Sequence, residues 1–244
     1  MENYEKQLDS FDAAERQEAL DALIEGANDC SITLPPVGSQ FNLHCHSFYS
    51  FNGYGYSPSS LAWHGRKAGL CAMGMVDFDV LDGADEFINA CNMLGLRCGA
   101  GLETRVFVAE FAGDEINSPG EPGISYHIGA GFTSSTITGK AAMLLRGLKA
   151  MAQQRTRIIL ERVNTLLEEI ALDFEEDVLP LTPAGNATER HVCAAYHDKA
   201  CTLFQNKDEL AQYWSKKLNT PVEQIAKALN DPPVFQGILR SKTM

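Results

Sequence analysis

The chain has 244 residues, of which 45% are hydrophobic and 21% are charged, and its formal net charge is −12 at pH 7. This composition is that of an ordinary globular protein, and the length suits one large domain or one and a half smaller ones. The negative charge argues against nucleic acid as a partner, because affinity for phosphate backbones comes from clustered Lys and Arg.

Residues 1–38 are predicted to form an N-terminal helical extension. The first residues are acidic and polar, unlike a secretory signal. A helix is expected to begin near Ser10 or Asp12, and Pro35 and Pro36 end its pattern. No apolar run in the chain approaches the roughly 18 residues of a membrane span, so we expect a cytoplasmic protein without a membrane partner.

Residues 39–138 alternate short apolar strands with helices. The expected helices cover 59–68 and 84–94, and the expected strands cover 41–46, 72–76, part of 97–108, and 125–132. Such alternation predicts an α/β fold with a mostly parallel sheet or barrel. In these folds, ligands bind at the carboxyl ends of the strands.

Residues 139–244 have a different pattern. Apolar residues at helical spacing from Leu144 to Ile170 predict a long amphipathic helix. Further short helices are expected to begin near Asn206 and at Thr220-Pro221. This part of the chain is therefore predicted to be a helical segment that consists of a long helix and a helical insertion.

His44-Cys45-His46 is the sharpest local pattern in the sequence. In an extended strand, residues i and i+2 point to the same face, so both imidazoles can reach one metal ion. Two partly exposed histidines at the end of a strand are the alternative interpretation of this short pattern.

Four segments resemble, in order and spacing, the motifs of the PHP (polymerase and histidinol phosphatase) superfamily of metal-dependent phosphoesterases. They are FNLHCHSFYSFNGYGYSP, AMGMVDFD, GAGLE and YHIG, within residues 41–132. The resemblance implies the first half of a (β/α)7 TIM-like barrel, with about four strands present, followed by the helical segment.

The resemblance also implies a set of metal ligands. His44 and His46 would bind a first metal, Glu103 would bridge two metals, and His127 would bind the second. A carboxylate suits the bridging role because its two oxygens can serve two cations. We expect one or two divalent ions of zinc, manganese or iron, and the ligand types do not choose among them.

Three further positions in the first two motifs are Phe51, Asp77 and Phe78. Phe51 and Phe78 stand where the family has ligands of a third metal, which suggests a centre with at most two metals. Asp77, at the end of its strand, is predicted to orient a ligating histidine. A helix cap or turn carboxylate is the alternative for Asp77.

A later segment, from Thr182 to His191, resembles a family segment that lies near the substrate phosphate. Arg190 or His191 would then neutralise charge on a phosphoryl group, and His191 could protonate the leaving group. A solvated arginine and a histidine at a helix start are the alternative.

The predicted function is hydrolysis of a small phosphorylated substrate, a phosphomonoester or nucleotide, by metal-activated water. The late Ala-His-Pro and Asp-x-His motifs of the family do not occur in the sequence, which favours a fragment of a longer protein over a divergent member with a reduced site. Two alternatives are a non-catalytic metal-binding or interaction module derived from a PHP domain, and a PHP domain attached to a polymerase. The negative charge argues against the polymerase.

Overall fold

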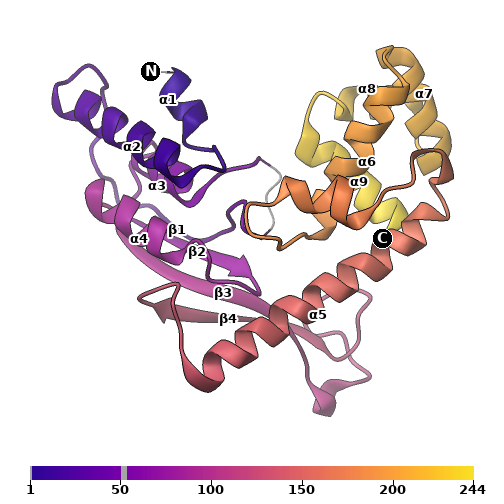
Figure 1. Cartoon of the computed structure of the whole chain (residues 1–244), viewed down its shortest axis with the longest axis horizontal. Coiled ribbons are helices and arrows are strands. Elements are labelled where there is room, and N and C mark those ends of the chain that lie inside the picture. Colours follow the sequence, from indigo (N-terminus) through magenta and orange to yellow (C-terminus); the bar gives the residue numbers. More distant parts are fainter. Residues whose placement is uncertain (1, 51–53) are drawn as a thin grey trace. The chain divides into compact units, whose positions relative to one another are not determined.

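The computed structural model describes residues 2–50 and 54–244, and it contains a four-stranded sheet and a set of helices (Figure 1). The strands are β1 (Phe41–Cys45), β2 (Ala72–Phe78), β3 (Arg97–Phe107) and β4 (Ile124–Phe132). The helices are α1 (Glu2–Gln7), α2 (Ala13–Asn28), α3 (Pro58–Lys67), α4 (Ala84–Met93), α5 (Gly139–Asn164), α6 (Glu189–Leu203), α7 (Lys207–Leu218), α8 (Val222–Ala228) and α9 (Pro232–Thr243). Shorter helical turns are η1 (Ala109–Phe111), η2 (Glu168–Ile170), η3 (Phe174–Val178) and η4 (Leu179–Leu181).

The chain divides into two compact units. The first unit consists of Met1–Tyr49 and Tyr56–Leu148, and the second unit consists of Ser50–Gly55 and Lys149–Met244. The boundary between them falls inside α5, after Leu148. Each unit has a hydrophobic core of its own.

The sheet of the first unit is mixed and has the strand order β1-β2-β3-β4. β1, β2 and β3 are parallel, whereas β4 is antiparallel to β3. Parallel neighbours need a long crossover, which α3 and α4 supply. Residues 108–123 contain only the short turn η1, so β3 returns directly into an antiparallel β4. The α/β class agrees with the sequence prediction, and three of the four strands are parallel, as expected of a mostly parallel sheet, while β4 makes the sheet a mixed one.

One face of the sheet is covered by α2, α3 and α4 (Figure 1). Met73 and Met75 of β2 pack there against a core whose largest fully buried side chains include Trp63 and Phe87. Leu20 of α2 is also buried in this core. Helices from residues 1–38 therefore contribute to the core of the first unit.

A buried ion pair ties α2 to α4. Arg16 is 2% exposed and donates from Nε to Glu86 at 2.9 Å. Glu86 also accepts hydrogen bonds from the backbone N and Oγ of Ser59, at 3.2 and 2.8 Å, in the first turn of α3. Since a buried charge is tolerated only when it is paired and hydrogen-bonded, this network ties the three helices to one another.

β1 passes very close to β2 at Gly74. A Cβ atom at Gly74 would lie 2.5 Å from the carbonyl oxygen of Leu43 and 2.8 Å from its Cα. Gly99, the register partner of Gly74 in β3, has nothing within 4 Å of such an atom. Only glycine at position 74 allows this approach, which sets the path of β1 directly before His44.

The second unit is helical. Its core includes the fully buried side chains of Tyr196 in α6, Trp214 in α7, Ile225 in α8 and Phe235 in α9. Several helices start at predicted positions, for example α7, whose N-cap Asn206 accepts a hydrogen bond from the backbone N of Asp208. Among the described residues, no helix has the length and apolar character needed to cross a bilayer.

Candidate metal centre

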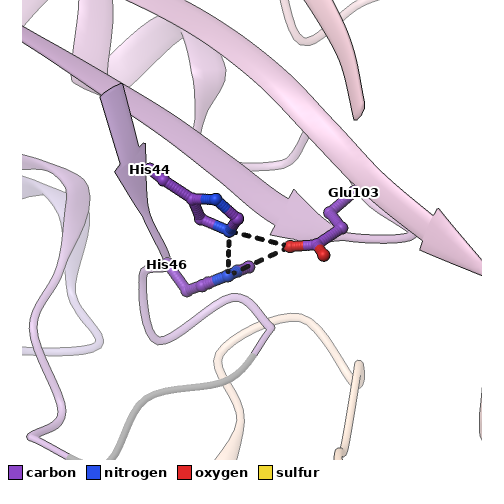
Figure 2. A group of neighbouring side chains, drawn as sticks. All are labelled: His44, His46 and Glu103. Atoms are coloured by element: carbon purple, nitrogen blue, oxygen red, sulfur yellow. Dashed lines mark hydrogen bonds and ion pairs between the residues drawn. The ribbon is translucent and has the colours of Figure 1, made fainter. Parts of the chain in front are cut away.

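Three predicted ligands meet at one end of the sheet (Figure 2). The Nε2 atoms of His44 and His46 lie 3.2 Å apart. Oε2 of Glu103 lies 3.0 Å from Nε2 of His44 and 3.3 Å from Nε2 of His46. Glu103 is thus 59 residues from His44 in sequence and in direct contact with it.

Strand geometry explains this convergence. His44 is in β1, His46 follows its last residue, and the two side chains point the same way because they are two residues apart. Glu103 lies in β3, directly opposite Phe78 of β2 in the parallel register. These side chains share the sheet face opposite the one that packs on α2, α3 and α4.

The donor set fits a divalent metal. Tetrahedral ligands with bonds of about 2.0–2.1 Å are separated by roughly 3.3 Å. The three separations among His44, His46 and Glu103, from 3.0 to 3.3 Å, agree with that spacing. Two imidazoles and a carboxylate can bind zinc, manganese or iron.

The surroundings keep His46 neutral. Burial, together with the nearby His44, lowers the pKa of His46 to about 4. The side chain of His46 is 15% exposed, whereas that of His44 is 52% exposed. A neutral imidazole has a lone pair available for a metal at neutral pH, so this environment suits a ligand.

Phe78 covers one side of His46. The two rings are stacked, with centroids 4.3 Å apart and an interplanar angle of 18°. An aromatic ring therefore stands where the family resemblance places a third-metal ligand. Phe51, the other position of that hypothesis, lies outside the described residues.

Asp77 is buried behind the histidines. It is 1% exposed and accepts hydrogen bonds from the backbone N of Ser47 at 2.7 Å and from Oγ of Ser47 at 2.6 Å. Ser47 directly follows His46, so Asp77 holds the backbone that presents this histidine. Asp77 thus contacts the residue next to a ligand, and the predicted effect on a ligating histidine would act through that backbone.

The structure does not bring His127 into this group of described residues. In the antiparallel register, His127 is opposite Thr104, whereas Glu103 is opposite Ile128. Directly opposed residues share a face and neighbours alternate, so the β4 register places His127 and Glu103 on different faces. A role for His127 as a ligand of a second metal stays a prediction.

Arg190 and His191 belong to the second unit, on α6. Nη1 of Arg190 donates to the carbonyl oxygen of Pro233 at 3.1 Å. Nδ1 of His191 accepts a hydrogen bond from the backbone N of Thr188 at 3.0 Å, and burial lowers the pKa of His191 to about 4. Both residues have contacts within their own unit, and their predicted action on a phosphoryl group stays a prediction.

Arg105 is a residue of this region that the sequence interpretation missed. It lies two residues after Glu103 in β3, and its Nη2 donates to Glu121. Its guanidinium carbon is 5.8 Å from the centre of the Tyr126 ring. The alternation of strand side chains, applied to the residues after Glu103, could have identified it.

Comparisons with known proteins agree with the fold. No family model and no curated protein matches the chain. The chain is similar to a solved structure from Bifidobacterium adolescentis that is assigned as a metal-dependent phosphoesterase, with 19% identity and a TM-score of 0.52. This similarity covers 75% of the present chain and 56% of that protein, so the chain spans little more than half of its length.

A second solved structure is an amidohydrolase from Chromobacterium violaceum with bound sulfate and no metal. It shares 17% identity at a TM-score of 0.46, over 75% of this chain and 57% of the other. The first similarity supports the α/β fold, and the second is too low to support a conclusion.

Proposed function

We propose that the chain is part of a metal-dependent phosphoesterase of the PHP type, which hydrolyses a small phosphomonoester or nucleotide in the cytoplasm. The observation that carries this proposal is the convergence of His44, His46 and Glu103 at metal-ligand spacing. The fold similarity to a protein assigned as a metal-dependent phosphoesterase supports the same class of reaction.

The proposed chemistry assigns distinct tasks to the residues of the chain. One or two divalent ions, when bound, supply a water of lowered pKa and positive charge for the phosphoryl oxygens. His44 and His46 would hold such an ion through their Nε2 atoms, and Glu103 would contribute a carboxylate. Phe78 shields one side of His46 from water, and Asp77 fixes the backbone at Ser47.

We also propose that the sheet of the first unit is part of a (β/α)7 barrel. Three parallel strands carry their helices on one face, as barrel strands do. Large apolar side chains elsewhere on the strands are exposed: Phe41 by 64%, Leu43 by 56%, Phe107 by 62% and Ile128 by 49%. A closed barrel would enclose residues of this kind.

Hydrolysis of a chromogenic phosphate monoester in the presence of Mn²⁺ or Zn²⁺ tests the proposal. We expect turnover that needs the metal and disappears in His46→Ala and Glu103→Gln. Unchanged turnover in both variants would refute the proposed centre. Tight metal binding without turnover would refute the enzymatic activity and support a metal-binding module.

A further inference from the structure

A cationic side chain, that of Arg105, lies on the same strand as Glu103 of the proposed metal centre. Arg105 follows Glu103 by two residues, so both side chains point to the same face of β3, roughly 6.6 Å apart along the strand. The Arg105 side chain is only 16% exposed. Arg105 therefore brings a positive charge to this face of β3, whereas the chain as a whole has a net charge of −12.

The guanidinium of Arg105 has unused hydrogen-bonding capacity. An arginine offers five N–H donors. Nη2 of Arg105 donates to Glu121, while Nε is buried and has no partner in the described part of the chain. An oxyanion could accept from the remaining donors, and a planar guanidinium matches the spacing of phosphoryl oxygens.

Aromatic rings connect Arg105 to the metal ligands. The guanidinium lies over Tyr126, and the rings of Tyr126 and Phe78 are 6.1 Å apart. Phe78 in turn stacks on His46. These contacts place Tyr126 and Phe78 between Arg105 and His46 in one continuous layer on this face of the sheet.

Glu121 is the more accessible partner of the ion pair. Its side chain is 43% exposed, compared with 16% for Arg105, and it accepts a hydrogen bond from Oγ of Ser118 in the loop before β4. Because the Glu121 carboxylate is the exposed side of this part-buried pair, a more highly charged group arriving from solvent could replace it at the guanidinium.

We propose that Arg105 is a specificity-determining residue that binds the phosphoryl oxygens of a phosphomonoester at the metal centre, and that Glu121 competes for the guanidinium when no substrate is bound. This inference rests on the proposed function and adds to it the cation that selects a doubly charged phosphate. If the ion pair of Arg105 and Glu121 were purely structural, loss of either partner would have the same effect on phosphate affinity. Under this inference the effects are opposite: loss of Arg105 weakens phosphate binding, and loss of Glu121 strengthens it.

Calorimetric titration of inorganic phosphate into the protein, with and without Mn²⁺, measures this affinity. We expect Arg105→Gln to weaken binding about 10- to 100-fold, as for loss of a charge-assisted hydrogen bond. Glu121→Gln should tighten binding, by roughly 3- to 10-fold, because the competing charge is gone. Arg97→Gln is the matched control, since Arg97 is an exposed arginine of β3 on the same face, roughly 26 Å away along the strand.

The outcomes separate the two interpretations. If both variants of the ion pair weaken phosphate binding equally, the pair only supports the loop and the inference is wrong. An unaffected Arg105→Gln, or a wild-type protein that binds no phosphate, also overturns it. If Arg105→Gln does not fold by thermal melting, Arg105→Lys replaces it, with an intermediate affinity expected and wild-type affinity contradicting the inference.

The proposed function has its own test. Suppose that turnover depends on metal and is lost in His46→Ala, but that Arg105→Gln leaves phosphate affinity unchanged. This result would leave the phosphoesterase proposal intact and refute only the present inference. If turnover persists in His46→Ala and Glu103→Gln, the proposed function is refuted, whatever the phosphate affinity of the Arg105 variant.

Discussion

Asp77 binds both the backbone N and the hydroxyl of Ser47, 30 residues earlier in the chain. The carboxylate thus links the end of β2 to the backbone that follows His46. Because both partners are buried, these hydrogen bonds are shielded from competing water.

Loss of this carboxylate should therefore affect both stability and the metal centre. We expect Asp77→Ala to lower the free energy of unfolding by about 3 kcal/mol, because two donors of Ser47 remain buried without an acceptor. Metal affinity should fall about tenfold, as for other residues that support a ligand. Urea unfolding and Zn²⁺ titration measure the two effects, and Asp82→Ala, at an exposed position, is the control. Equal behaviour of the two variants would contradict the positioning role.

Removal of a direct ligand should be more severe for metal binding. We expect His44→Ala, His46→Ala and Glu103→Gln each to weaken Zn²⁺ or Mn²⁺ binding by about 100-fold or more, since supporting residues alone cost 10- to 100-fold. His64→Asn is the matched control, because His64 is a histidine of α3 in the first unit that does not belong to the group. Competition with a chromogenic chelator measures the affinity. Wild-type affinity in the Glu103 variant would refute the site.

Metal analysis tests the number of ions. Phe78 fills space beside His46 with an aromatic ring, so we expect at most two tightly bound ions per chain. Elemental analysis of protein purified without chelators gives the ratio directly. Three tightly bound ions would contradict the hypothesis drawn from Phe51 and Phe78.

The two register-paired glycines give a sharp test of how β1 is positioned. We expect Gly74→Ala to destabilise the first unit by about 1–3 kcal/mol and to weaken metal binding, because its new methyl group would overlap the backbone of Leu43. Gly99→Ala adds the same atom on the neighbouring strand, where nothing lies within 4 Å, and should change stability by less than about 1 kcal/mol. Similar losses in both variants would show that close packing at Gly74 does not matter.

The stability of the second unit should depend on pH through His191. Burial lowers its pKa to about 4, whereas an unfolded histidine titrates near 6.5, so the unfolded chain takes up the proton first as pH falls. The contribution is complete above about pH 6.5 and declines between pH 6.5 and pH 4, by about 3 kcal/mol at most. Protonation of Nδ1 would also remove the acceptor for the backbone N of Thr188.

His191→Gln separates this effect from other titrations, because glutamine at this helix position keeps an acceptor but has no charge to gain. Urea unfolding in a Trp63→Phe background lets Trp214, the remaining tryptophan, report on the second unit. We expect the variant to lose less stability than the wild type between pH 7 and pH 5. An identical pH dependence would contradict the assignment to His191.

The resemblance to the PHP motifs implied that His44, His46 and Glu103 come together. The two-residue alternation within a strand independently indicated that His44 and His46 share a face, and the parallel register of β2 and β3 in the structure places Glu103 opposite Phe78. Local signals also predicted helix starts near Ser10 or Asp12 and near Asn206, and the side chains of Asp12 and Asn206 cap these helices.

Features that depend on register or on distant contacts were harder to predict. The direction of β4 follows from the loop of residues 108–123, and its register decides the face of His127. A one-residue shift would reverse that face, and nothing in the local sequence fixes it. The pairing of Arg105 with Glu121 likewise depends on how this loop returns, which no periodic pattern reveals.

The pairing of Arg16 with Glu86 limits how far the first unit can be shortened. Trimming the chain to the start of β1 would remove Arg16 and leave the Glu86 carboxylate without its buried counter-charge. It would also remove Leu20 and Leu23 from the hydrophobic core that they form with residues of α3 and α4. A minimal metal-binding fragment, or a graft of this centre onto another scaffold, therefore has to carry residues 2–28 along with the strands that hold the ligands.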